Sequence, residues 1–206
     1  MIVDPATLAP RDMYRFMIHV VVPRPIAWIS TVSATGVRNL APYSFFNALT
    51  SRPPLLGVSI NARPGGPKDT LANIRATGEF VVNLVDEPLA ERMVRTSGEW
   101  PPEVDEFDVA GVTAAPSDLV RAPRVAESPV SMECRLHREI PLGDTTFVIG
   151  EIVRARVADD RLTDGWPDVE KLRPVGRLGG EGYALLGRLL RIPRPKVERP
   201  LGPGGG

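Results

Sequence analysis

The sequence predicts a mainly β protein, an antiparallel barrel or sandwich with flanking short helices. At least five apolar runs rich in β-branched and aromatic residues are bounded by Gly, Pro or Asp. These runs do not alternate regularly with helical patterns, which disfavours a doubly wound parallel sheet. Prolines and glycines, 22 and 19 in number, are spread between the runs, as in a folded chain with many turns.

Two pairs of apolar runs predict β-hairpins. The first pair lies in segment 26–46 and flanks SATG at 33–36, a small polar turn that contains a glycine. The second pair, 128–140 and 145–157, flanks the turn PLGD. Alternation of apolar residues breaks at Gly150, which predicts a β-bulge there. Further strands are expected at 53–60 and 79–85.

Three segments carry helical signals. Asp69 precedes TLANIRAT in the position of a helix N-cap, and Asp86 precedes EPLAERMVRT, whose Pro88 suits a first helical turn. The stretch APRDMYRFM at 9–17 predicts a third helix near the N-terminus. The helices are therefore short and scattered among the strands.

Length and composition predict one domain over residues 1–195, followed by a disordered Pro/Gly-rich tail at 196–206 that begins at Lys196. Lys plus Arg equals Asp plus Glu at 25 each, so the balance of charge argues against a nucleic acid partner. A single cysteine, Cys134, and the lack of a Cys/His cluster favour a reducing cytoplasm and no metal. No stretch has the pattern of a signal peptide or a membrane span.

The run PGGPKDT at 64–70 has the composition of a phosphate-binding corner. Glycines allow a tight turn, Lys68 supplies a positive charge, and the amides that follow Asp69 begin a helix with a partial positive charge. The alternative is that Asp69 or Thr70 only caps the helix while Lys68 stays solvated. The run lacks the spacing of a P-loop.

The run APYSFFNALTS at 41–51 places polar side chains among aromatic ones. Ser44, Asn47, Thr50 and Ser51 interrupt the apolar residues, and a flat heterocycle needs such a mixture of apolar faces and edge donors. An ordinary loop with capping hydroxyls is the alternative.

Hydrolytic chemistry has little support in the sequence. There is no GxSxG motif, and the two histidines, His19 and His137, fit structural or surface roles. Cys134 shares its strand parity with Met132 and Leu136, which favours a buried, inert thiol. No catalytic acid, base or nucleophile is assigned.

Three separated segments, 23–60, 67–85 and 173–187, together resemble the flavin reductase-like family of FMN-binding split barrels, and in particular its flavoredoxin-like subgroup. The resemblance covers about residues 10–195. It implies a six-stranded Greek-key split β-barrel with flanking helices, a homodimer, and FMN in a groove near the subunit interface.

The same resemblance implies a set of FMN-binding residues. The isoalloxazine would lie beside one strand, the edge and ribityl chain would contact the PYSFFN segment, and the phosphate would contact the KDT group. The residues beside the isoalloxazine would be Arg24, Pro25, Ala27, Trp28 and Ser30. Those at the ring edge and ribityl chain would be Ser44, Phe45 and Asn47, and those at the phosphate would be Ser59, Lys68, Asp69 and Thr70.

The implied activity is transfer of a hydride from NADH or NADPH to FMN, for a small acceptor or a partner monooxygenase. Arg24 is the candidate cation beside the reduced ring. Many related reductases carry Gly-Asp-His where this chain has Gly143, Asp144 and Thr145. That difference favours an alternative, a flavoredoxin-like electron carrier reduced by a protein donor. A non-catalytic flavin-binding protein is the third possibility.

Overall fold

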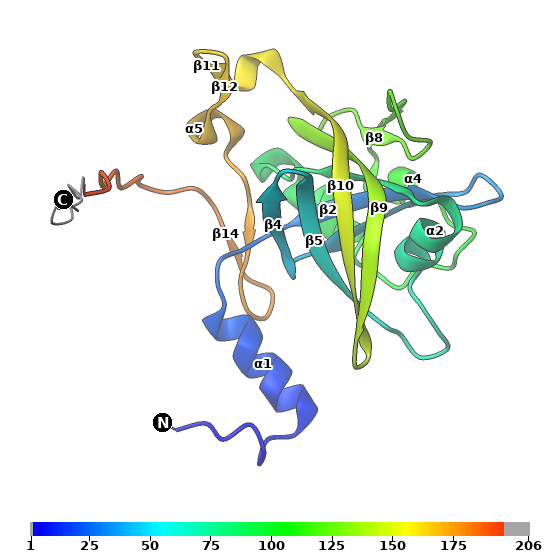
Figure 1. Ribbon diagram of the computed structural model, residues 1–206, viewed down its shortest axis with the longest axis vertical. Helices are drawn as coiled ribbons and strands as arrows, with labels where there is room; N and C mark the ends of the chain where they lie inside the picture. Colours follow the sequence, from blue (N-terminus) through cyan, green and yellow to red (C-terminus); the bar gives the residue numbers. More distant parts are fainter. Residues whose placement is uncertain (1, 196–206) are drawn as a thin grey trace, which may run out of the picture.

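The computed structural model describes residues 2–195. Its centre is a seven-stranded antiparallel sheet with the order β3-β2-β6-β9-β10-β5-β4 (Figure 1). The predicted β-rich fold is confirmed, whereas the predicted tail from Lys196 lies outside the described residues. The strands of this sheet are β2 (Ala27–Val32), β3 (Arg38–Tyr43), β4 (Phe46–Ser51), β5 (Pro54–Asn61), β6 (Glu79–Asn83), β9 (Val130–Leu142) and β10 (Thr145–Val157).

One bent segment closes the sheet into a barrel. Strands β3 and β4 follow each other in the chain but stand at opposite edges of the sheet, so the bend at Ser44 and Phe45 joins the two edges. The Ser59 N–H of β5 donates to the Phe45 carbonyl at 2.8 Å and fixes the bend. If β3 and β4 are counted as one bent strand, the barrel has the six strands that the resemblance implies.

Both predicted hairpins and the predicted bulge are confirmed. Strands β2 and β3 pair on either side of the SATG turn, and β9 and β10 pair around Gly143, which has a φ of 63°. The register of β10 against β9 shifts between Ile149 and Gly150. A Cβ at Gly150 would lie 2.2 Å from the Phe80 ring, so a larger residue would displace that core side chain.

All three predicted helical segments are confirmed, with one correction at α2. This helix begins at Asp69 itself, its N-cap is Lys68, and no side chain caps it. The Asp69 carboxylate binds Arg63 instead. The helices are α1 (Pro10–Val20), α2 (Asp69–Thr77), the 3-10 helix η1 (Glu87–Leu89) that leads into α3 (Ala90–Arg95), α4 (Glu106–Ala110), the 3-10 helix η2 (Asp159–Arg161) and α5 (Val169–Leu172).

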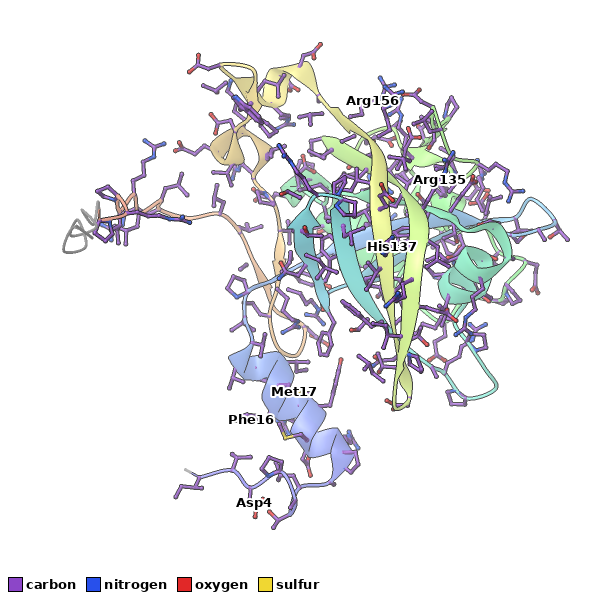
Figure 2. The ribbon with its side chains drawn as sticks, viewed as in Figure 1. Asp4, Phe16, Met17, Arg135, His137 and Arg156 are labelled. Carbon is purple, nitrogen blue, oxygen red and sulfur yellow. The ribbon has the colours of Figure 1, made fainter. Side chains whose placement is uncertain are left out.

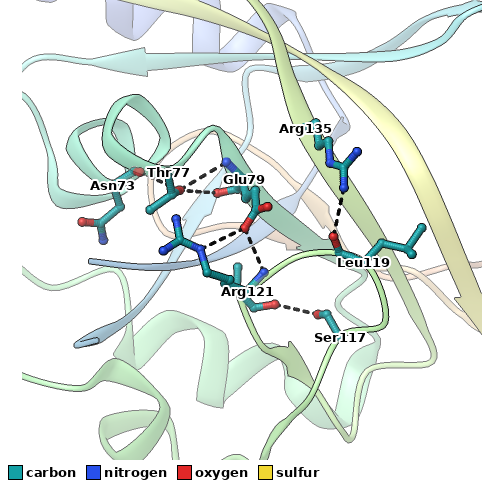
Figure 3. A network of polar contacts seen from close by, with 8 residues as sticks. Asn73, Thr77, Glu79, Ser117, Leu119, Arg121 and Arg135 are labelled. Atoms are coloured by element: carbon teal, nitrogen blue, oxygen red, sulfur yellow. Dashed lines mark hydrogen bonds and ion pairs between the residues drawn. The ribbon is translucent and has the colours of Figure 1, made fainter. Parts of the chain in front are cut away.

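Short strand pairs connect distant parts of the chain. Pairing of β1 with β13 brings the RPIAW segment beside the RLGG segment, about 150 residues away. A loop at 117–121 is tied to the barrel because Glu79 accepts from the Arg121 N–H at 2.9 Å and Arg135 donates to the Leu119 carbonyl (Figure 3). The short strands are β1 (Arg24–Pro25), β13 (Gly176–Arg177), β14 (Tyr183–Ala184), β7 (Ala114–Ala115), β8 (Arg124–Val125), β11 (Leu162–Thr163) and β12 (Trp166–Pro167).

The core has two large clusters that share strand β2. Ala27 and Ile29 point into the barrel, where they pack with residues such as Phe80. Trp28 points to the opposite face and packs with Phe107 of α4 and other buried residues. Both faces of β2 are therefore covered, and its two neighbours β3 and β6 cover its edges.

Helix α1 lies at the margin of the molecule (Figure 1). It has no buried residue, and its Tyr14, Met17 and Val20 are exposed. Figure 2 shows Met17 on this helix well away from His137, whose side chain is exposed on β9. No helix within residues 2–195 is long and apolar enough to cross a membrane.

Candidate functional site

Several adjoining pockets meet at the bend between β3 and β4. One of them brings together four residues that the sequence predicted for the site, namely Ser44, Phe45, Ser59 and Lys68. Hydrophobic, hydroxyl, amide and ammonium groups therefore face one space. The full lining of this pocket is Tyr14, Pro42, Tyr43, Ser44, Phe45, Ser59, Asn61 and Lys68.

The buried side chain of Arg24 fixes the position of the bend through hydrogen bonds. Its guanidinium donates to Ser44 Oγ at 3.2 Å, to the carbonyls of Ile18 and Val21 at 2.8 Å, and to that of Leu178 at 2.9 Å. The residue is only 6 % exposed, and this burial, with the nearby charge of Arg177, lowers the pKa of Arg24. Arg24 thus joins the end of α1, the bend and the segment after β13.

Three cations surround the bend without a carboxylate partner among residues 2–195: Arg24, Lys68 and Arg177. Arg177 lines a pocket with Tyr43 and Ser44, and its guanidinium lies 4.6 Å from the centre of the Tyr183 ring. Lys68 Nζ lies 5.8 Å from the centre of the Tyr43 ring. A cluster of uncompensated positive charge favours an anionic ligand.

The start of α2 adds backbone donors beside Lys68. The first helical hydrogen bond runs from the Ala72 N–H to the Lys68 carbonyl, so the amides of residues 69–71 precede it. No side chain of the described part of the chain caps them. Arg63 donates to both Asp69 oxygens, at 2.8 and 3.1 Å, and offsets their negative charge. This corner keeps the donors that an anion needs.

Thr70 is placed differently from the prediction. Its side chain is 1 % exposed, and its hydroxyl donates to Asn39 Oδ1 at 2.7 Å. Asn39 in turn donates to Glu106, whose pKa is raised by burial. The Thr70 hydroxyl therefore belongs to a buried network under the pocket, and only its backbone amide is suited to a ligand.

Ala27, Trp28 and Ser30 are not brought to the site. All three are 0 % exposed. The Trp28 Nε1–H donates to Thr96 Oγ1 at 2.9 Å, and the Ser30 hydroxyl donates to the Pro123 carbonyl. The side chains are enclosed because both faces of β2 are covered.

The remaining predicted residues lie on the other side of the bend. Pro25 and Asn47 are exposed and line one pocket with Arg24, Ser44 and Phe45. This pocket also receives Met17 and Val21 from α1 and the turn that follows it. It offers a mainly apolar surface beside the cationic corner.

Thr145 adjoins the same bend. Its hydroxyl donates to Asn61 Oδ1 at 3.0 Å, and it lines a pocket with Tyr14 and Phe45, whose ring centres are 6.2 Å apart. The position that the resemblance singled out is therefore near the site, with a hydroxyl in place of an imidazole.

Sequence reasoning missed several lining residues. Tyr43 stands in the aromatic run at 41–51, and Arg177 stands in the segment 173–187 that carries part of the family resemblance, so both had a signal. Tyr14 and Trp100 had none, because only the folded chain brings α1 and the loop after α3 to the bend. Groups of three or more His, Cys, Asp or Glu that could hold a metal are absent within residues 2–195.

Comparison with known proteins identifies the family. The model of the flavin reductase like domain matches residues 18–169. The chain belongs to this family.

Solved structures agree with this membership. Nitrilotriacetate monooxygenase component B from Bacillus cereus is 35 % identical with a TM-score of 0.90, over 93 % of this chain and 98 % of that one. The 2-nitrobenzoate 2-nitroreductase NbaA of Pseudomonas fluorescens is 31 % identical with a TM-score of 0.88, over 98 % and 100 %. Flavoredoxin of Desulfovibrio vulgaris (Miyazaki F) is 25 % identical with a TM-score of 0.75, over 84 % and 91 %. The family and these relatives support a flavin-related oxidoreductase.

Proposed function

We propose that this protein binds FMN at the bend between β3 and β4 and reduces it with NADH or NADPH, for a small acceptor or a partner monooxygenase. The observation that carries the proposal is the group of three cations, Arg24, Lys68 and Arg177, around a bend with apolar and hydroxyl side chains. A flavin mononucleotide has a flat apolar ring, polar ring edges and a phosphate, and each part has a matching surface here.

Lys68 and the first amides of α2 would hold the phosphate, with Arg63 keeping Asp69 neutralised. Ser44, Phe45 and Ser59 would contact the ring edge and ribityl chain, while Pro25 and Asn47 border the apolar side. Ala27, Trp28 and Ser30 are left out of the proposed contacts because they are enclosed in the core.

A bound flavin supplies the capacity to accept a hydride at its ring. The protein's part is to orient the ring and to stabilise negative charge on it. Arg24 is held by hydrogen bonds to three carbonyls, and its guanidinium lies 5.8 Å from the centre of the Phe45 ring, so its positive charge is already in place beside the proposed site. Arg177 adds a second positive charge beside Tyr43. No side chain is assigned as an acid or base.

We further propose a cytoplasmic homodimer in which α1 contributes to the subunit contact. Helix α1 has no buried residue, and its large apolar side chains Tyr14, Met17 and Val20 are exposed. An exposed apolar surface of this kind is typical of a site where another protein binds. Tyr14 and Met17 also line the pockets at the bend, so the flavin would lie near the interface. The single domain over residues 1–195 remains a prediction.

The experiment is a visible spectrum of the freshly purified protein, supplemented with FMN if colourless, before and after NADH or NADPH is added without oxygen. Rapid bleaching of the flavin bands by either nucleotide supports the reductase. A bound flavin that neither nucleotide bleaches contradicts nicotinamide-dependent reduction, and failure to bind added FMN contradicts the site.

A second candidate is a flavoredoxin-like electron carrier, and Thr145 is the observation that favours it. The resemblance places a histidine of the nicotinamide-using reductases at this position, and the hydroxyl here is already bonded to Asn61. The carrier predicts tight FMN and negligible nicotinamide oxidation, followed by rapid reduction by a protein donor such as a reduced ferredoxin.

A further inference from the structure

A second pocket continues from the bend, beyond Lys68. It lies between the start of α2 and residues 96–100, the segment that follows α3. Pro42, Tyr43 and Lys68 line both this pocket and the one at the bend. A molecule whose phosphate lies at Lys68 can therefore extend in two directions, and FMN would use only the direction toward Phe45.

Most charges in this second pocket already have partners. Asp69 is bonded to Arg63 through both oxygens. Glu106, only 6 % exposed, accepts from Asn39 Nδ2 at 2.8 Å and from the Leu40 N–H at 3.2 Å. These carboxylates hold the pocket together and are not free to bind a ligand.

Two charged side chains of the pocket, Lys68 and Glu99, have no hydrogen bond or ion pair to any residue in the range 2–195. One is a cation at the junction with the bend, and the other is a carboxylate in the segment 96–100. An extended anion would fit the first but be repelled by the second. A phosphate followed by a neutral group with hydroxyl donors matches both.

Trp100 adds an aromatic surface to this pocket. Its Nε1–H donates to the Arg95 carbonyl at 3.0 Å, which fixes the ring, and the residue is 38 % exposed. Gly98 allows this arrangement, because a Cβ there would lie 3.0 Å from the Trp100 Nε1. A fixed, partly exposed indole is a stacking surface for a heterocyclic base.

We propose that this second pocket is a subsite for the adenosine half of FAD. The adenine would stack on Trp100, a ribose hydroxyl would donate to Glu99, and the pyrophosphate would lie at Lys68 and the start of α2. FAD would then bind more tightly than FMN, which ends at the phosphate. The inference rests on the proposed flavin site and adds to it a preference for a dinucleotide.

The test compares dissociation constants of FAD and FMN for the wild type, Trp100→Ala, Trp100→Phe and a matched control, Trp166→Ala. Trp166 is 77 % exposed on β12, outside the pockets described above. Loss of one stacked base corresponds to roughly tenfold weaker binding. We expect Trp100→Ala to weaken FAD about tenfold and FMN less than about twofold, while Trp100→Phe keeps most FAD affinity and Trp166→Ala changes neither.

Several outcomes would overturn the subsite. They are equal losses of FAD and FMN in Trp100→Ala, no loss of FAD, or a loss in Trp100→Phe as large as in Trp100→Ala. The last result would trace the effect to the lost bond to the Arg95 carbonyl. An increased KM for NADH with unchanged FAD affinity would assign the adenosine to the nicotinamide nucleotide instead.

The same titration separates this inference from the proposed function. A wild type that binds FMN at least as tightly as FAD would overturn the adenosine subsite and leave the flavin site standing. A wild type that binds neither flavin would overturn both.

Discussion

Strand β2 differs in exposure from the bend at Ser44 and Phe45 and its flanking residues 43–47, although both lie in the segment 23–60 that carries part of the family resemblance. In β2, Ala27, Trp28 and Ser30 are 0 % exposed. In the bend, Ser44 is partly exposed and Asn47 is exposed, and both line pockets. Residues of similar chemical type, an aromatic ring and small polar groups, are core in one place and surface in the other.

The difference follows from how many neighbours each segment has. Strand β2 is hydrogen-bonded on both edges and packed on both faces. At the bend the chain passes from one edge of the sheet to the other, so it does not have a paired strand on each side as β2 does. Its side chains are therefore less enclosed. A motif match therefore identifies a segment, and the sheet topology decides which of its side chains can reach a ligand.

The largest expected effect that tests this comparison comes from Trp28→Ala. We expect the free energy of unfolding to fall by about 3–5 kcal/mol, because a large buried side chain is removed together with the hydrogen bond that it donates to Thr96 Oγ1. Urea unfolding followed by circular dichroism measures this loss, and Trp166→Ala, on the surface, should change it by about 0.5 kcal/mol or less. Unchanged stability with weakened flavin binding would return Trp28 to the site.

Arg24→Lys is expected to have the next largest effect. Lysine keeps the charge but cannot reach all the carbonyls of Ile18, Val21 and Leu178, so the free energy of unfolding should fall by about 2 kcal/mol. The exposed Arg75 of α2 provides a control, Arg75→Lys, with little change expected. Equal stability of the wild type and Arg24→Lys would show that the hydrogen bonds of Arg24 contribute little to folding.

Lys68→Ala sharpens the comparison on the side of the bend. We expect FMN to bind roughly 10- to 100-fold more weakly, since a charged hydrogen bond to the phosphate is lost, while riboflavin affinity stays unchanged. Fluorescence titration of both flavins measures this, with Lys171→Ala on α5 as a control that should affect neither. Equal losses of affinity for FMN and riboflavin, or no loss for FMN, would show that Lys68 does not bind the phosphate.

Glu106→Gln is expected to give the smallest effect, visible as a change in pH dependence. Burial raises the pKa of Glu106 above its ordinary value of 4.5, so the folded state keeps a proton that the unfolded chain has lost. The free energy of unfolding should therefore fall as pH rises above 4.5 through the raised pKa. Urea unfolding between pH 4.5 and 7 should show a shallower fall in Glu106→Gln, and parallel curves would contradict the shift.

The sequence was sufficient to predict the local features of the fold. Both hairpins and the bulge at Gly150 follow from turn residues and from a break in alternation, which act over a few neighbours. Pairing of Asp69 with Arg63 was missed because the sequence pattern predicted the commoner capping role. Burial of β2 was missed because it depends on α4 and β6, which come later in the chain.

The site could be predicted in part for the same reason. Ser44, Phe45, Ser59 and Lys68 share a pocket as expected, and their motifs lie within about 25 residues of each other. Arg177 and Trp100 reach the bend only through contacts between distant segments. Such contacts leave no periodic signal in a single sequence.

The bent segment that closes the barrel also limits how the site can change shape. Residues 43–47 cannot shift along the neighbouring strands without breaking hydrogen bonds between β2 and β3 and between β4 and β5. The bend is therefore the rigid part of the site. A change of shape to fit ligands of different size must then come from the elements around the bend. These elements are α1, the segment 96–100 and the hairpin of β13 and β14, none of which belongs to the seven-stranded sheet.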